Sequence, residues 1–251
     1  MDTVRVEREE DLAVVTIDRP ERRNALGSRD ARAVGAAISA GARGARVVIL
    51  TGAGEAFSAG GDLDELERWG DLEPAEIGAA LYESFQGMIR AIRSSDAIVI
   101  AAINGAAVGP GMDLALACDL RIAAENARLG QVWVRLGVIP GTGGAWLTQH
   151  LAGPGRAAQL LLTGELIDAR TALDAGLVNE VCPASDLMPR ARALAARILA
   201  HPAGGVVANK RALVAASERG LEEALAHAAE VQPGRFTSDE FRKALRAART
   251  R

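Results

Sequence analysis

The segment IVIAAINGAAVGPGMDLALACD, residues 98–119, is the most informative part of this chain. Its first six residues are apolar and rich in β-branched side chains, which is typical of a strand buried on both faces. Asn104 and Gly105 interrupt the run, and Pro110 suits the first position of a helix because its missing N–H would be unpaired there. The segment therefore predicts a buried strand, a turn and a short apolar helix over 112–118.

Asp113 is the one acid in this apolar helix. The start of a helix concentrates unpaired N–H groups and positive dipole, so a carboxylate in the first turn is stabilised there. Two interpretations stay open from these residues alone. Asp113 either stabilises the start of the helix or takes part in chemistry at the end of the strand.

Composition excludes several classes of partner. The chain has 251 residues, 49% of them apolar, which is enough for one large domain or a domain with an appendage. Its net charge of −3 gives no reason to expect nucleic acid or an anionic membrane as a partner. Aromatic residues make up only 3%, too few for a platform on which single-stranded bases stack.

The cysteines and histidines indicate a reduced protein without a metal site. Cys118 and Cys182 lie in apolar surroundings and are expected to be free thiols. His150, His201 and His227 are scattered and lack metal-ligand spacing. We see no leader segment and no apolar run long enough to span a bilayer. We therefore expect a cytoplasmic protein with no membrane partner.

Periodicity predicts an α/β region followed by helices. A strand pair is expected over 3–8 and 12–18, and a helix over 28–41. A helix over 74–93 joins strands at 46–51 and 98–103, so these two strands should be parallel. Further helices are expected over 145–151, 156–162, 168–175, 184–200, 205–218, 221–231 and 238–249. The Pro-Ala-Gly-Gly sequence at 202–205 marks the boundary between a core, residues 1–200, and a C-terminal helical region, residues 201–251.

Three glycine-rich loops follow predicted strands, at 52–61, 105–111 and 137–144. Open α/β proteins bind ligands at such loops. A dinucleotide fold would need Gly-x-Gly-x-x-Gly, but the candidate at 52–57 lacks the third glycine. No Gly-x-Ser-x-Gly elbow occurs, which argues against a serine hydrolase. The loops at 59–62 and 109–113 could instead aim backbone N–H groups at one point, as in an oxyanion hole.

At these residues the chain resembles the enoyl-CoA hydratase/isomerase, or crotonase, superfamily. The resemblance implies a crotonase-like (ClpP/crotonase) α/β fold, a spiral of ββα units whose helical C-terminal region, residues 201–251, serves trimerisation. It implies a homotrimer or a dimer of trimers. It also implies an acyl-CoA substrate, with coenzyme A as part of that substrate and no other cofactor. The segments that carry it are 19–26, 56–63, 102–119, 137–144, 162–169 and 175–179.

The same resemblance assigns the ligand contacts. It places the thioester oxygen on the N–H of Gly61. Arg22 and Arg23 would lie along the CoA, where cations could meet its phosphates, although an exposed surface run is the other interpretation of these arginines. The remaining contacts that it implies are Ala25, Ala59, Gly60, Asp62 and Leu63, and Asp62 could also cap the helix that follows it.

The positions that carry the family's acid–base chemistry are altered. Hydratases of the family use two glutamates, one to activate water and one to protonate the α-carbon. Asp113 occupies the first position and is one methylene shorter. Trp133 occupies the second, where an indole can donate a hydrogen bond but cannot take a proton. Pro110 stands at the second N–H position of the oxyanion hole and has no N–H, which leaves Gly111 as a substitute donor.

We therefore expect an enzyme that acts on an acyl-CoA thioester through an oxyanion-stabilised enolate, with Asp113 as acid or base. Hydration, decarboxylation and displacement all remain open as the reaction. Two alternatives are kept: a crotonase-fold hydrolase that cleaves a carbon–carbon bond of a β-diketone, and a catalytically weak acyl-CoA-binding protein. Binding of CoA without turnover would distinguish the last of these.

Overall fold

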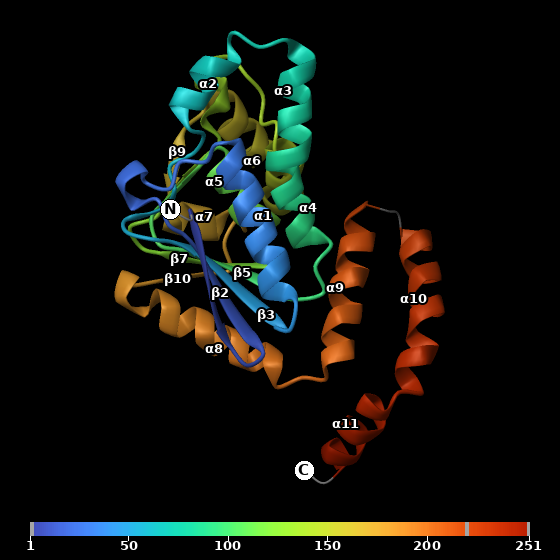
Figure 1. Ribbon diagram of the computed structural model, residues 1–251. Helices are drawn as coiled ribbons and strands as arrows, with labels where there is room; N and C mark the ends of the chain where they lie inside the picture. The colour runs from blue at the N-terminus through green and yellow to red at the C-terminus, as the bar shows by residue number, and fades with distance from the viewer. Residues whose placement is uncertain (1–2, 219–220, 250–251) are drawn as a thin grey trace.

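A six-stranded sheet forms the centre of the computed structural model, which describes residues 3–218 and 221–249 (Figure 1). The first two strands pair antiparallel and the others pair parallel, including the predicted pair β3 and β5. In spatial order the strands are β1 (Val4–Glu9), β2 (Leu12–Ile17), β3 (Val47–Gly52), β5 (Ile98–Ile103), β7 (Leu120–Ala124) and β10 (Glu180–Cys182).

A second, four-stranded sheet was not expected from the sequence. The glycine-rich stretches 52–61 and 105–111 were predicted to be loops throughout, and this was wrong because each contains a short strand. Strands of three residues are too short to show an alternating pattern. In order, this sheet contains β4 (Ala56–Ser58), β6 (Ala106–Val108), β8 (Arg128–Gly130) and β9 (Leu166–Asp168).

The helices follow the predicted segments apart from shifts at their ends, the largest in the helix expected over 221–231, which continues to Phe236, and apart from two internal differences. The helix expected over 74–93 contains a single π-helical turn at Leu81–Phe85, between α3 and α4. The helices expected at 145–151 and 156–162 run together as α6, with a break at Gly153, whose φ is +76°. The other short segments are 3₁₀ turns at Pro20–Arg22, Val132–Leu136 and Ala184–Asp186. The core helices are α1 (Ser28–Ala42), α2 (Leu63–Trp69), α3 (Pro74–Ala80), α4 (Gln86–Arg93), α5 (Pro110–Ala117), α6 (Gly144–Thr163), α7 (Ala169–Asp174) and α8 (Leu187–Leu199).

Strands β2, β3 and β5 of the large sheet are buried on both faces, as their continuous apolar sequences require, whereas the edge strand β1 is mostly exposed. Alternate residues of a strand point to opposite faces. Val48 and Leu50 therefore pack in one apolar cluster with α1 and α4, whereas Val47 and Ile49 pack in the other with α8. Burial on both faces fixes the register, because a shift by one residue would exchange the two sets of side chains.

The C-terminal region is helical, as predicted from residue 201 onward. It contains α9 (Ala203–Glu218), α10 (Leu221–Phe236) and α11 (Asp239–Arg249), and Figure 1 shows α10 and α11 standing away from the sheets. Lys210 of α9 ties the region to the core: its buried Nζ donates to Ala97 O at 2.7 Å and to Asp119 Oδ2 at 2.8 Å. None of the helices in the described part of the chain is long and apolar enough to cross a membrane.

Candidate active site

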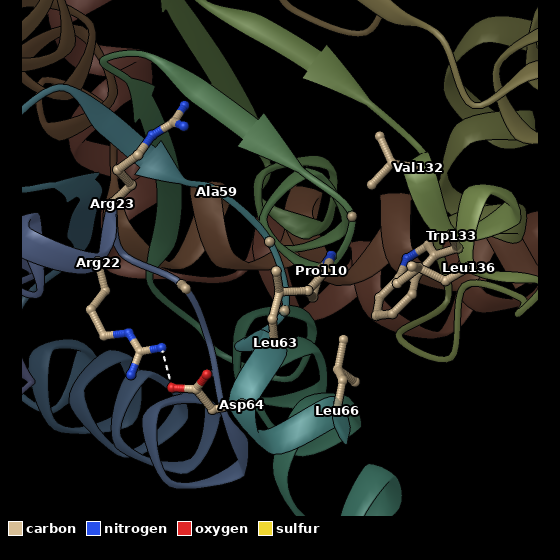
Figure 2. A pocket seen from close by; sticks show the side chains of 14 residues that line it. Arg22, Arg23, Ala59, Leu63, Asp64, Leu66, Pro110, Val132, Trp133 and Leu136 are labelled. Atoms are coloured by element: carbon tan, nitrogen blue, oxygen red, sulfur yellow. Dashed lines mark hydrogen bonds and ion pairs between the residues drawn. The ribbon is translucent and has the colours of Figure 1, made fainter. Parts of the chain in front are cut away.

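A cavity of about 430 Å³ lies between the loop after β4, the start of α5 and the 3₁₀ turn at Val132–Leu136. Figure 2 shows labelled side chains on its wall, with Leu63 and Leu66 from α2 and Trp133 and Leu136 from that turn (Figure 2). Most of the residues that the sequence assigned to the site do line this cavity. They are Arg22, Arg23, Ala25, Ala59, Gly60, Gly61, Leu63, Pro110 and Trp133.

Backbone pairing brings two distant segments together at the cavity. The N–H of Ala59 donates to Arg23 O at 2.9 Å, and that of Leu26 donates to Gly60 O at 2.8 Å. Asp62 N–H in turn donates to Leu26 O at 2.9 Å. In a parallel pairing of this kind the flanking residues bond to the partner, so the N–H of Gly61 is directed away from Leu26. Because Gly61 lines the cavity, its N–H is available to a ligand oxygen.

Asn24 holds the basic loop in place, a role that the sequence analysis missed. Its buried side-chain amide donates to Ala53 O at 2.9 Å and Ala56 O at 2.6 Å, and accepts from the N–H of Arg19 at 2.9 Å. Arg23 and Asn24 both have a positive φ, of 52° and 57°. Asparagine adopts this conformation more readily than most residues, and that preference was the available signal.

Asp62 supports the loop and does not line the cavity. Its buried carboxylate caps α2 by accepting from Asp64 N–H at 3.2 Å, as the sequence suggested. The same carboxylate forms ion pairs with two guanidinium groups, at 3.4 Å from Arg19 Nη2 to Oδ2 and at 3.5 Å from Arg22 Nη2 to Oδ1. Its assignment as a ligand contact is therefore not supported by its position.

Arg22 and Arg23 differ in their ion pairs. Figure 2 shows Arg22 turned toward Asp64, with an Nη2–Oδ2 distance of 2.6 Å. This guanidinium holds the pKa of the Asp64 carboxyl below its usual range. Arg23, in contrast, is exposed and makes no ion pair with any residue that the structure describes. Arg23 is thus the free cation at the cavity.

Neither Pro110 nor Gly111 supplies a second backbone donor. Pro110 lines the cavity at the first position of α5, where it has no N–H. Gly111 does not line the cavity; it packs on Ser58, where a Cβ would lie 2.6 Å from the Ser58 Cβ. Gly111 is therefore required for close packing, and its suggested role as the substitute donor finds no support in its position.

Asp113 does not line the cavity, and its carboxylate lies in a buried polar cluster. Its carboxylate accepts from Gln131 Nε2 at 2.6 Å and from the hydroxyl of Thr142. Gly144 closes this cluster, because any Cβ there would overlap the carboxylate. The residue is fully buried, and desolvation raises its pKa to about 6 although both hydrogen bonds act to lower it. This position does not support the predicted role of Asp113 as acid or base toward a ligand in the cavity.

Gln131, Thr142 and Gly144 were not identified from the sequence. The glycine-rich stretch 137–144 was noted, but a glycine required for close approach to a side chain cannot be told from a turn glycine by composition. Replacement of Gly144 by alanine would force the Asp113 carboxylate from its partners.

The variant Asp113→Asn should stabilise the protein at pH 8 by about 1–3 kcal/mol. The carboxyl has a higher pKa when folded than when unfolded, so its contribution to stability is lost as the pH rises from about 4 through 6. A neutral amide avoids that loss, and about half of the gain should remain at pH 5. Urea unfolding at both pH values measures it, with Asp30→Asn as a control that breaks the buried pair with Arg19 and should destabilise. A destabilised Asp113→Asn at pH 8 would show that the charge is required for folding.

Trp133 lies on the cavity wall against Gly109, where a Cβ would be 3.6 Å from the indole nitrogen. That Nε1 is sealed from solvent and has no hydrogen-bond partner within the described residues. The indole occupies the position expected for the second acid, so no carboxylate stands there. Among the described residues that line the cavity, Asp64 carries the one carboxylate, and Arg22 binds it.

Comparison with known proteins shows the same family as the sequence motifs. The family model described as enoyl-CoA hydratase/isomerase matches residues 7–250. A probable enoyl-CoA hydratase of Rhodobacter capsulatus is 37% identical over 98% of this chain and 94% of its own length. The short-chain-enoyl-CoA hydratase of Clostridium acetobutylicum is also 37% identical, with the same coverage.

Solved structures agree in fold. Enoyl-CoA hydratase from Bacillus anthracis superposes with a TM-score of 0.92 at 31% identity, covering 99% of this chain and 96% of that one. A Thermobifida fusca structure in complex with CoA gives a TM-score of 0.85 at 32% identity, covering 94% and 93%. These matches confirm the crotonase fold, and this chain belongs to the enoyl-CoA hydratase/isomerase family of enzymes.

Proposed function

We propose that this protein binds an acyl-CoA thioester in the cavity and stabilises an enolate with the N–H of Gly61. The observation that carries the proposal is the free Gly61 N–H, held toward the cavity by the pairing of its neighbours with Leu26. A backbone donor fixed in advance stabilises charge that develops on a carbonyl oxygen. The named hydratase relatives and the CoA complex of a relative support the choice of ligand.

The altered acid positions favour an enolate that forms without a protein base. Loss of CO₂ from an acyl-CoA with a carboxylate on its α-carbon leaves the electron pair on that carbon and on the thioester oxygen, and water then supplies the proton. Such a decarboxylation needs the oxyanion donor but no pair of carboxylates. Apolar side chains around the cavity, including Leu63, Leu66 and Leu136, would destabilise the carboxylate relative to the product.

Calorimetric titration with acetyl-CoA tests the binding, and incubation with malonyl-CoA tests the reaction. We expect saturable heat with acetyl-CoA and release of CO₂ with malonyl-CoA. Binding without turnover of malonyl-CoA or crotonyl-CoA would favour the acyl-CoA-binding alternative. An absence of heat at millimolar acetyl-CoA would overturn the proposal and favour the β-diketone hydrolase.

The variant Arg23→Gln should weaken binding of CoA by about 3- to 10-fold, because an exposed cation adds a modest charge-assisted hydrogen bond to a phosphate. Arg22→Gln is the matched control and should change binding less, since Arg22 is already held by Asp64 and Asp62. Titration of CoA into each variant at low and high salt measures the difference. An equal loss of CoA affinity in the two variants would show that Arg23 does not contribute more than Arg22 to phosphate binding.

We also propose a homotrimer or a dimer of trimers. The C-terminal helices expose large apolar side chains, with Leu213 72% and both Leu225 and Phe236 54% accessible. Exposed apolar surface of this kind marks an interface. Light scattering should give a mass that is three or six times 26.1 kDa. A mass of one chain at micromolar concentration would contradict the assembly.

A further inference from the structure

One of the two cations at the cavity is already paired with an acid of the same chain. Arg22 and Arg23 both line the cavity, and in Figure 2 they lie on one side of the view, with Trp133 and Leu136 on the other. The cavity thus has a cationic part and an apolar part. Asp64 lines it too and accepts from Arg22 Nη2 at 2.6 Å, whereas Arg23 makes no ion pair within the described part of the chain. An anionic group that reaches the cationic part therefore finds Arg23 free and Arg22 occupied.

The pair between Arg22 and Asp64 is one that a ligand can displace. Both side chains are exposed, with 41% of Arg22 and 62% of Asp64 accessible. An exposed ion pair is screened by water and contributes little, so a phosphate competes well with the carboxylate. A second carboxylate, that of the buried Asp62, lies 3.5 Å from the same guanidinium and also pairs with Arg19. Asp62 therefore keeps Arg22 beside the cavity, and Asp64 is the acid that a phosphate meets as a competitor.

The position of α2 does not depend on the Asp64 carboxylate. Asp62 caps the helix by accepting from the backbone N–H of Asp64 at 3.2 Å, a donor that any residue except proline provides. Glu65 accepts from the N–H of Ser28 at 2.9 Å and ties α2 to the start of α1. A change confined to the side chain at residue 64 should therefore leave the wall that α2 gives the cavity intact.

We infer that Asp64 is a specificity-determining residue: it withholds Arg22 from the phosphates of the ligand and so lowers the preference for a CoA thioester over the same thioester without phosphates. The inference rests on the proposed function. A phosphate that binds Arg22 must displace the Asp64 carboxylate or bind beside it, and like charges on one guanidinium repel each other. Arg23 meets a phosphate without this competition. Asp64 is thus the reason why Arg22 adds less to ligand binding than its charge allows.

The test compares acetyl-CoA with S-acetylpantetheine, which carries the same thioester and no phosphate. Asp64→Asn should raise the affinity for acetyl-CoA by about 3- to 10-fold, because the released guanidinium adds a charge-assisted hydrogen bond to a phosphate. The affinity for S-acetylpantetheine should not change, which shows that the cavity of the variant is intact. Calorimetric titration measures both affinities. The gain should shrink at high salt, where exposed charges are screened.

Two further variants separate the release of Arg22 from a general loss of negative charge. Glu21→Gln removes an equal charge from the exposed residue before Arg22, which does not line the cavity, and should raise the affinity for acetyl-CoA by less than about 2-fold. The double variant Arg22→Gln/Asp64→Asn should bind acetyl-CoA no more tightly than Arg22→Gln, because no guanidinium remains to be released.

The outcomes distinguish this inference from the proposed function. If wild type binds neither ligand, the proposed function fails. If wild type binds acetyl-CoA and Asp64→Asn leaves that affinity unchanged, the proposed function stands and this inference is overturned. A gain that persists when Arg22 is glutamine, or an equal gain in Glu21→Gln, would overturn it as well.

Discussion

Crotonyl-CoA should be hydrated very slowly by this protein, and the variant Trp133→Glu/Pro110→Gly should hydrate it at least about 10²-fold faster. Hydration requires one group to take a proton from water and another to protonate the α-carbon. Asp113 is buried away from the cavity, and Trp133 cannot exchange a proton. The wild type thus has neither group in place.

The size of the gain follows from two contributions that act on one transition state. A positioned acid or base contributes roughly 10²–10⁴-fold, and an oxyanion donor about 10²–10³-fold. The factors need not multiply, because the groups are coupled. Trp133→Glu alone still lacks a second oxyanion donor, and Pro110→Gly alone still lacks a carboxylate at residue 133, so the double variant should exceed each single one.

The loss of crotonyl-CoA absorbance measures these rates, with Asp113→Asn as the control. That control should leave the slow wild-type rate unchanged, since its carboxylate does not line the cavity. Wild-type turnover in the hundreds per second that Asp113→Asn abolishes would contradict the account of the altered acids.

The variant Lys210→Met should destabilise the protein by about 3 kcal/mol, the largest stability effect that we expect. Lys210 is only 4% exposed, and its Nζ donates to Ile92 O at 3.1 Å as well as to Ala97 O and Asp119 Oδ2. Methionine fills similar space but leaves the Asp119 carboxylate without its cation. The cost arises because the buried carbonyl oxygens of Ile92 and Ala97 lose their donor. In addition, the Asp119 carboxylate, whose side chain is 23% exposed, keeps only the N–H of Val99 as a donor among the described residues.

Arg211→Ala is the matched control at the next position. Arg211 pairs with Asp96 at 2.8 Å, but both side chains are more than half exposed. Such a pair contributes under about 1 kcal/mol. Urea unfolding at one protein concentration compares the two variants with the wild type. A Lys210→Met variant within 1 kcal/mol of the wild type would show that α9 is not tied to the core through this cation.

The fold was largely predictable because its strands are long and apolar. The run at 98–103 was predicted as a buried strand with the bounds that β5 has, and Pro110 opens α5 as expected. The second sheet was not predictable, because strands of three residues are too short to show an alternation of apolar and polar side chains. Their register depends on contacts between segments that are far apart in the chain.

The site was predictable where backbone forms it and not where burial redirects a side chain. Gly61 of the motif at 59–62 lines the cavity. Asp113 was assigned to the site from its position in a motif, but its carboxylate is held elsewhere by Gln131 and Thr142. Both partners lie in the segment that joins β8 to α6, and only the folding of the chain brings that segment against α5. The motif therefore predicted the backbone position of Asp113, in the first turn of α5, but not the partners of its side chain.

A structure of the protein with acetyl-CoA tests the central claim most directly, through the distance from the thioester oxygen to the backbone nitrogen of Gly61. The account predicts a hydrogen bond of about 2.7–3.2 Å, with the acetyl group between Leu63 and Trp133 in the cavity. An acetyl-CoA bound outside this cavity, or with its thioester oxygen turned away from the Gly61 N–H, would contradict it.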